Sequence, residues 1–254
     1  MHSCSLPPDL DLAVGVRLAL DGAIVVDPTF GDLTVASLQD AGVPVVTTGR
    51  VPADKRPAAW VDKYHPGATR AMLDHLARQG ARRIAMVTSK PLISYTVDAE
   101  GAYRDWCESH DAPPLVAYVR GGLTESAGFA AASELLVRRD RPDAIYATYD
   151  RLGLGALLAA EAQRIAVPGE LLVAACTDRA AARNATPPLT ALNLNAEAIG
   201  SEAAHLLLDL VERQGKESED HISVPTRMVV RASSPRRSGG ESAGRSSTRR
   251  ERNG

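Results

Sequence analysis

The sequence has little cysteine and no long apolar run. Its 254 residues include three scattered cysteines, Cys4, Cys107 and Cys176, with no CxxC spacing. This pattern argues against a disulfide framework and indicates a reducing compartment. No stretch reaches the roughly 18 apolar residues of a membrane-spanning helix. The N-terminal segment MHSCSLPPDLDLA also lacks the basic start and continuous apolar stretch of a secretory signal. We therefore expect a cytoplasmic protein without a membrane partner.

Catalytic and cofactor motifs are also missing. Gly153-Leu154-Gly155 lacks the third glycine of a dinucleotide-binding fingerprint, and neither a GxSxG elbow nor a Walker A sequence occurs. The six histidines show no metal-ligand spacing. The net charge of -2 argues against binding of a polyanion by the molecule as a whole. The sequence thus predicts no catalytic residue, no metal and no cofactor.

Short apolar runs alternate with segments of helical periodicity. The runs are rich in Val, Ile and Ala and mostly do not alternate with polar residues, which is typical of parallel strands buried on both faces. The candidate strands are Ala23–Val26, Pro44–Thr48, Arg83–Thr88, Leu115–Val119, Ala144–Ala147, Leu171–Cys176 and Arg227–Arg231. The candidate helices are Gly67–Arg78, Ala99–Glu108, Ser126–Arg138, Leu152–Gln163 and Ala196–Glu212, with Thr124 and Asp150 as possible N-caps. Alternation of this kind predicts an α/β fold with right-handed crossovers.

A series of short segments then follows in a fixed order along the chain. The segments are Asp21–Val26, Gly42–Val46, Gly49-Arg50, His75-Leu76 with Gly80–Ala85, Gly101–Tyr103, Pro142–Ala147 with Asp150, Val167–Leu171, Pro187–Thr190 and Val230–Ser234. Each one resembles a landmark of the LacI/GalR transcription regulators, and together they are specific because their order is kept.

The resemblance implies a periplasmic-binding-protein fold of type I, with two doubly wound parallel-sheet subdomains joined by three crossovers. We expect residues 1–90 and about 194–219 in an N-terminal subdomain, and 91–193 with about 220–232 in a C-terminal one. The Ser-, Gly- and Arg-rich stretch 233–254 is expected to be a disordered, net basic tail. The family also implies a homodimer and a small-molecule effector, such as a sugar, held between the subdomains.

The chain departs from the family at its N-terminus. Family members begin with a helix-turn-helix headpiece, and only about twenty residues precede Asp21 here. A strand, a helix and a second strand usually open the sensing domain, whereas only the helix-like stretch Leu10–Leu20 is present. We therefore expect an N-terminally truncated chain, from a misassigned start or a gene fragment, that would contact DNA only through a headpiece it lacks. A stand-alone sensor is the alternative.

Three polar positions of the family's usual sugar site are changed. Asp98 stands where an arginine is usual, Tyr149 replaces an asparagine, and Thr177 replaces the first acid of a pair. An aspartate in place of arginine favours a cationic or hydroxyl-rich ligand, or indicates a degenerate pocket. The candidate ligand-binding residues are Arg50, Asp62, Tyr95, Asp98, Tyr149, Asp150 and Thr177.

Several of these candidates also have structural interpretations. Asp150 is equally suited to cap the following helix. Asp62 fits a solvated loop acid, and Tyr95 and Tyr149 fit wall aromatics with their hydroxyls in water. As a whole, the sequence favours the sensing domain of a LacI-type regulator. A solute-binding protein of a transport system is the alternative, and an enzyme on an α/β fold is a third class for which no catalytic constellation is present.

Overall fold

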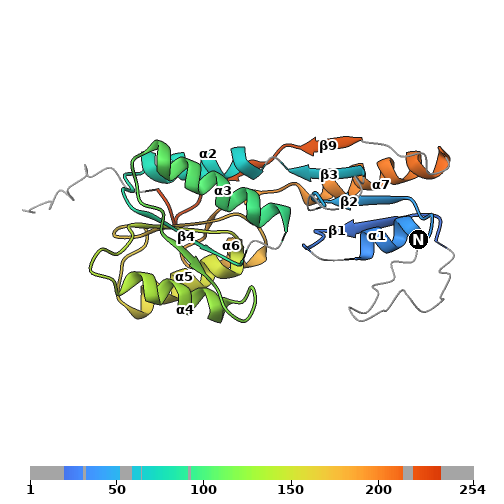
Figure 1. Cartoon of the computed structure of the whole chain (residues 1–254). Helices are drawn as coiled ribbons and strands as arrows, with labels where there is room; N and C mark the ends of the chain where they lie inside the picture. The colour runs from blue at the N-terminus through green and yellow to red at the C-terminus, as the bar shows by residue number, and fades with distance from the viewer. Residues whose placement is uncertain are drawn as a thin grey trace, which may run out of the picture.

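The computed structural model describes residues 20–30, 33–51, 59–63, 65–90, 93–213 and 220–235. The expected helix-like stretch Leu10–Leu20 lies almost wholly outside the described residues, as does the expected tail beyond Pro235. In the described ranges, no helix combines the length and the apolar character needed to cross a membrane. The described residues form two lobes, each built on its own sheet and lying end to end (Figure 1).

The first lobe contains a four-stranded sheet in which every neighbouring pair runs parallel. Its strands in spatial order are Ala23–Val26 (β1), Val45–Thr48 (β2), Ala59–Lys63 (β3) and His221–Val224 (β9), and its helices are Thr34–Asp40 (α1) and Ala196–Glu212 (α7). Alternate residues of β2 face opposite helices. Val46 packs with Leu206 of α7 on one face, whereas Val45 packs with Leu38 of α1 on the other. This is why the segment reads as a continuous apolar run.

The second lobe contains a six-stranded sheet covered by helices on both faces (Figure 1). Its strands in spatial order are Arg227–Val229 (β10), Thr190–Asn193 (β8), Leu172–Ala175 (β7), Ala144–Ala147 (β6), Ile84–Thr88 (β4) and Val116–Tyr118 (β5), and only the β10–β8 pair is antiparallel. Its helices are His65–Arg78 (α2), Ser94–Ser109 (α3), Glu125–Leu136 (α4), Asp150–Ala162 (α5) and Ala180–Asn184 (α6). One core lies between the sheet and α2 and α3, and another between the sheet and α4 and α5.

Helices α4 and α5 approach each other through glycines. A Cβ atom on Gly155 would lie 2.3 Å from the carbonyl oxygen of Glu125, and one on Gly128 would lie 2.6 Å from that of Leu152. These contacts explain the Gly153-Leu154-Gly155 segment as helix packing rather than nucleotide binding. The expected N-cap at Thr124 is confirmed, because its hydroxyl accepts a hydrogen bond from the amide of Ala127 at 3.1 Å.

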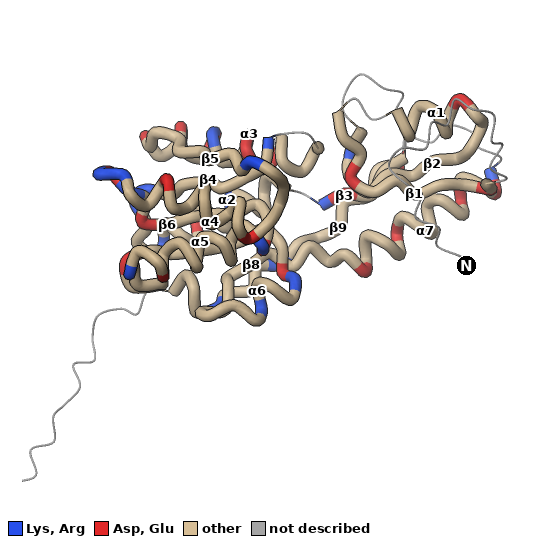
Figure 2. Tube along the Cα trace, turned by 90° about the horizontal axis from the view of Figure 1, so that it is seen from below, with Lys and Arg blue, Asp and Glu red and all other residues tan. Residues whose placement is uncertain are grey.

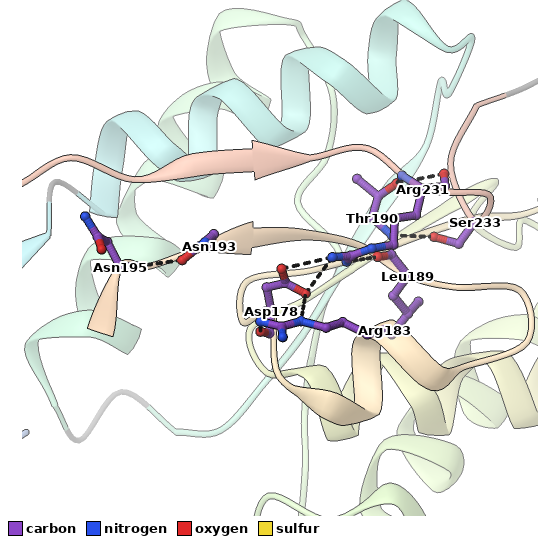
Figure 3. Close-up of polar contacts among 8 residues, drawn as sticks. All are labelled: Asp178, Arg183, Leu189, Thr190, Asn193, Asn195, Arg231 and Ser233. Carbon is purple, nitrogen blue, oxygen red and sulfur yellow. Dashed lines mark hydrogen bonds and ion pairs between the residues drawn. The ribbon is translucent and has the colours of Figure 1, made fainter. Parts of the chain in front are cut away.

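The described chain crosses between the lobes at three places: between Lys63 and His65, between Asn193 and Ala196, and between Val224 and Arg227. At the second crossing Asn195 adopts the left-handed conformation with φ of +54°, which asparagine tolerates better than most residues. Its amide donates to the side-chain oxygen of Asn193 at 2.9 Å (Figure 3). The three crossovers match the expected architecture.

The two sheets place the boundaries between the lobes at other residues than the expected subdomain boundaries. Helix α2 and strand β4 were expected in the N-terminal subdomain with residues 1–90, but β4 pairs with β5 and β6 in the second lobe. Strand β9 was expected in the C-terminal subdomain with residues 220–232, but it pairs with β3 in the first lobe. The first crossing therefore lies at Lys63–His65, because the hydrogen bonds of β4 are made entirely in the second sheet.

The expected start of the tail at Ser233 is also too early. Ser233 and Ser234 are completely buried. The Ser233 hydroxyl donates to the carbonyl oxygen of Val173 at 2.6 Å. It also accepts from the amide of Thr190 at 2.8 Å (Figure 3). The Ser234 hydroxyl lies 2.7 Å from Nε2 of His75. The two serines are therefore held against the second lobe by hydrogen bonds. They were assigned to the tail because serine does not have the apolar character by which buried segments are recognised.

Candidate functional site

Four side chains of alternating charge lie in a row across the junction between the two lobes. Arg50, directly after β2 in the first lobe, forms an ion pair with Asp98 on α3 of the second lobe. Its Nε atom also lies 3.7 Å from Oδ2 of Asp62 on β3. The other oxygen of Asp62 lies 3.3 Å from Nε2 of His65, the first residue of α2. Acidic and basic positions accordingly lie side by side where β3 leaves the first lobe (Figure 2).

Backbone contacts support this junction. The amide of Arg50 donates to the hydroxyl of Ser94, the first residue of α3, at 3.1 Å. Thr29 forms an isolated antiparallel bridge with Ile93. Gly49 has a φ of +96°, and a Cβ atom on it would lie 3.1 Å from a carboxylate oxygen of Asp27. The absence of a side chain at Gly49 thus lets the ends of β1 and β2 and the start of α3 come together.

The pair of Asp62 and His65 is buried, with side-chain exposures of 4% and 1%. Burial alone would raise the pKa of Asp62, but contact with His65 outweighs it and lowers that pKa. Burial alone would lower the pKa of His65, but Asp62 and Cys176 raise it. The expected alternative of a solvated loop acid at position 62 is wrong, because Asp62 lies in a strand and is buried.

Aromatic side chains flank this pair on the side of the second lobe. The ring of Tyr95 lies 4.6 Å from that of His65 and meets Tyr149 edge-on at 5.3 Å. The Tyr95 hydroxyl donates to the carbonyl oxygen of Thr148 rather than to water, and the residue is buried. Tyr149 is partly exposed, and its pKa is raised by burial and by the charge of Asp27 from the other lobe.

Asp150 and Thr177 bind each other at the carboxyl ends of β6 and β7. The Thr177 hydroxyl donates to Oδ1 of Asp150 at 3.1 Å and accepts from the Asp150 amide at 2.8 Å. Both residues are buried. Helix α5 begins at Asp150 and its N-cap is Tyr149, so the N-cap expected at Asp150 is wrong. Asp150 acts instead in the first turn, where a negative charge favours the helix.

The structure thus places all seven candidate residues at the carboxyl ends of strands or on the adjoining turn of α3. Arg50, Asp62 and Asp98 form one connected group. Sequence reasoning missed His65 and Asp27. An acid directly after an apolar strand, as at Asp27, was a signal that could have been used, because ligands in open α/β sheets bind outside the carboxyl ends of strands. Within the described ranges, no group of three His, Cys, Asp or Glu side chains is placed to hold a metal ion.

Comparison with known proteins assigns the chain to a family. Residues 73–234 match the family described as a periplasmic binding protein-like domain. The HTH-type transcriptional regulator CelR of Thermobifida fusca is 31% identical over 220 residues, which cover 84% of this chain and 63% of CelR. The lactose operon repressor of Rhizobium radiobacter is 35% identical over 106 residues, which cover 42% of this chain and 92% of that protein. The chain belongs to the LacI family of transcription regulators.

Solved structures agree with this assignment to the LacI family. A transcriptional regulator CelR–cellobiose complex superimposes with a TM-score of 0.77 at 28% identity, covering 85% of this chain and 66% of that one. A LacI-family regulator from Sanguibacter keddieii gives a TM-score of 0.72 at 27% identity, covering 84% and 79%. The chain spans less than two thirds of the length of CelR. These relatives are regulators, which does not favour a transport protein or an enzyme.

Proposed function

We propose that this chain is the effector-sensing domain of a LacI-type regulator, which holds a small molecule at the junction between its lobes. The observation that carries the proposal is the convergence of polar side chains from the strand ends of both sheets on one junction, bridged by Arg50 and Asp98. A molecule bound there contacts both lobes at once, so binding changes how they are held together. The seven candidate residues are our proposed ligand-binding set.

The proposed effector is a saccharide. The support is that CelR, a similar protein, has been solved as a complex with cellobiose. Partly exposed Tyr149 offers an aromatic surface for the apolar face of a sugar ring, and carboxylates nearby offer acceptors for hydroxyl groups. We propose that the lobe arrangement set by the effector is read by a DNA-binding unit in the cytoplasm, in keeping with the HTH-type name of CelR.

We also propose that the working form is a homodimer that associates through the first lobe. Several apolar side chains of this lobe are exposed, namely Leu20, Ile24, Val26, Phe30, Leu33 and Leu208. Burial of these side chains against a second copy would remove them from water. Sedimentation velocity tests this part: the wild type should sediment as a dimer and Leu208→Glu as a monomer. A monomeric wild type would contradict the dimer.

Thermal unfolding in the presence of candidate effectors tests the sensing function. A ligand that binds only the folded state at 100 times its Kd stabilises it by about 2.7 kcal/mol. We expect at least one neutral saccharide, with cellobiose as the first probe, to raise the unfolding temperature in a concentration-dependent way. Absence of stabilisation by any saccharide in a broad panel would contradict a saccharide effector.

A further inference from the structure

Basic residues gather at the end of the second lobe that faces away from the junction. Three loops lead there into the amino ends of the neighbouring parallel strands β4, β6 and β7, namely residues 79–83, 137–143 and 163–171. Their charged residues are Arg82, Arg83, Arg138, Arg139, Arg141 and Arg164 against Asp140, Asp143 and Glu170. The three loops therefore carry a net charge of +3. Figure 2 shows basic positions in blue at this end of the lobe.

Polar contacts between the loops hold this surface in place. The carboxylate of Asp143 accepts hydrogen bonds from the backbone amides of Arg82 and Arg83, each at 2.9 Å. The guanidinium of Arg141 lies 3.1 Å from the carboxylate of Glu170, which joins the loop before β6 to the loop before β7. The three loops are therefore tied to one another, and the arginines on them form one surface.

Three of the six arginines are not paired with an acid in the described part of the chain. Asp140 is engaged by Arg83 at 2.5 Å. The side chains of Arg82, Arg139 and Arg164 are exposed and form no hydrogen bond or ion pair with the described residues. Each of these three comes from a different loop. Their guanidinium groups can therefore give all their donors to an external anion.

The described chain ends beside these loops. The carbonyl oxygen of Ser233 accepts from the amide of Val173, near the start of β7, at 3.0 Å. The Ser234 hydroxyl contacts His75 near the end of α2. Residues 236–254 follow directly, and their six arginines and two glutamates give them a net charge of +4. Since the whole chain carries -2, all remaining residues together carry -9, so positive charge is concentrated at one end of an otherwise acidic chain.

A partner with repeated negative charge fits this arrangement. Neighbouring strands lie about 4.8 Å apart, so the loops before three adjacent strands extend over about 10 Å. A DNA duplex carries one negative charge for about every 1.7 Å of its axis, so several phosphates can face a surface of this width. Guanidinium groups bind phosphate oxygens through two parallel hydrogen bonds. A single small anion would engage only one of the three loops.

We propose that the loops 79–83, 137–143 and 163–171, together with the arginine-rich residues 236–254, bind the phosphate backbone of duplex DNA without reading its sequence. Contacts to phosphates position a protein on DNA but carry no sequence information. The surface lies at the end of the second lobe away from the junction, so this contact is separate from effector binding. It differs from the expectation that DNA is contacted only through a headpiece.

The test measures binding of a fluorescein-labelled DNA duplex of arbitrary sequence by anisotropy, from about 50 to about 200 mM KCl. The loop variant combines Arg82→Gln, Arg139→Gln and Arg164→Gln. The matched control removes three exposed arginines that lie outside these loops, in the combination Arg70→Gln, Arg120→Gln and Arg213→Gln. In a third protein all six arginines of residues 236–254 are replaced by glutamine. Unfolding temperatures measured without DNA establish that each variant is folded.

We expect the wild type to bind the duplex with a Kd of about 10⁻⁴ to 10⁻⁶ M, the range of non-specific DNA binding, and more tightly at low salt. Each arginine that neutralises a phosphate contributes about 0.9 to the slope of log affinity against log salt. The loop variant should therefore lose up to about 2.7 of this slope and bind at least about tenfold more weakly at low salt. The variant of residues 236–254 should also lose slope. The control has the same net charge as the loop variant but should keep the wild-type slope.

Other results would overturn the proposal. Equal losses of slope in the loop variant and the control would show that only net charge matters and not the place of the arginines. An unchanged loop variant beside a weakened variant of residues 236–254 would remove the three loops from the contact. Tighter binding of poly-L-glutamate than of the duplex would replace nucleic acid by an acidic polypeptide as the partner. Failure of the folded wild type to bind the duplex at about 50 mM KCl would leave no DNA contact at all.

Discussion

Arg50 and Asp98 form an ion pair that joins the end of β2 in the first lobe to α3 in the second. Each lobe has its own sheet and its own core, so contacts of this kind set how the lobes are held relative to each other. The side chains are 42% and 18% exposed, so their attraction is partly screened by water and salt. The lobe arrangement should therefore depend on ionic strength.

Replacement of Asp98 by asparagine tests this dependence. The pair is partly exposed, so its loss should cost about 1 kcal/mol or less. The unfolding temperature of Asp98→Asn should fall below that of the wild type at low salt, and the difference should shrink in high salt. Asp105→Asn is a matched control on the same helix, because Asp105 pairs with Arg70 within one lobe and is 66% exposed. Equal effects of the two variants at every salt concentration would contradict a special role for the Arg50–Asp98 pair.

The packing of α4 on α5 gives a second prediction. A methyl group on Gly155 would meet the backbone of α4 at 2.3 Å, and backbone cannot move aside as a side chain can. We expect Gly155→Ala to lower the free energy of unfolding by about 2 kcal/mol or more. Gly200→Ala on α7 is the control, since nothing lies within 4 Å of a Cβ atom there. It should be neutral or stabilising by about 0.5–1 kcal/mol. Urea unfolding measures the free energy of unfolding of both variants. If Gly155→Ala were as stable as the wild type, the close packing of α4 on α5 would not matter for stability.

The sequence predicted the strands that form continuous apolar runs, but it missed β8, which is buried over Thr190, Ala191 and Leu192. Strands β2, β4, β6 and β7 read as continuous apolar runs because helices cover the sheet on each side. Strand β3 ends in two charged residues, Asp62 and Lys63, which lie at the junction between the lobes. Strand β9 is largely exposed. Neither has the apolar run by which a strand is recognised, so both were missed, and the lobe boundary was misplaced with them.

Part of the candidate site was predicted from the family resemblance rather than from apolar runs. Resemblance to the LacI family marked Arg50, Asp98 and Thr177 by their positions along the chain. It could not show that Arg50 and Asp98 pair with each other, because they are 48 residues apart and come from different lobes. Asp27 was passed over because it carries no family landmark. What distinguishes Asp27 is that its carboxylate forms no hydrogen bond or ion pair with the described residues, which only the folded arrangement reveals.

The pair of half-buried Arg231 and buried Asp178 gives a third prediction. The guanidinium of Arg231 donates to Asp178 at 2.9 Å and to the carbonyl oxygen of Leu189 at 2.8 Å (Figure 3). Asp178 is only 5% exposed, so Arg231→Met leaves a carboxylate with little water around it. We expect a loss of about 3 kcal/mol in unfolding free energy. The control is Arg183→Met, which removes a 59% exposed partner of the same acid and should cost much less. Equal losses would show that Arg231 has no special role.

The contact between His65 and Asp62 predicts a dependence of stability on pH. The pKa of His65 is raised in the folded protein, so its stabilising contribution is full below the ordinary value of 6.5 and is lost as the pH rises through the folded value. The pKa of Asp62 is lowered, so its contribution is present above 3.8 and is lost as the pH falls through the folded value. The pair therefore stabilises the fold most between these two ordinary values, near about pH 5.

His65→Gln tests this window. Its unfolding free energy should lie about 3 kcal/mol below that of the wild type near pH 5, because Asp62 loses its buried cationic partner. The deficit should narrow toward pH 9, as the pH rises through the raised pKa of His65 and the wild type loses the same positive charge. His205→Gln, at an exposed position on α7, is the control and should follow the wild type at both pH values. A deficit of the same size at pH 5 and pH 9 would mean that His65 acts through packing against Tyr95 rather than through its charge.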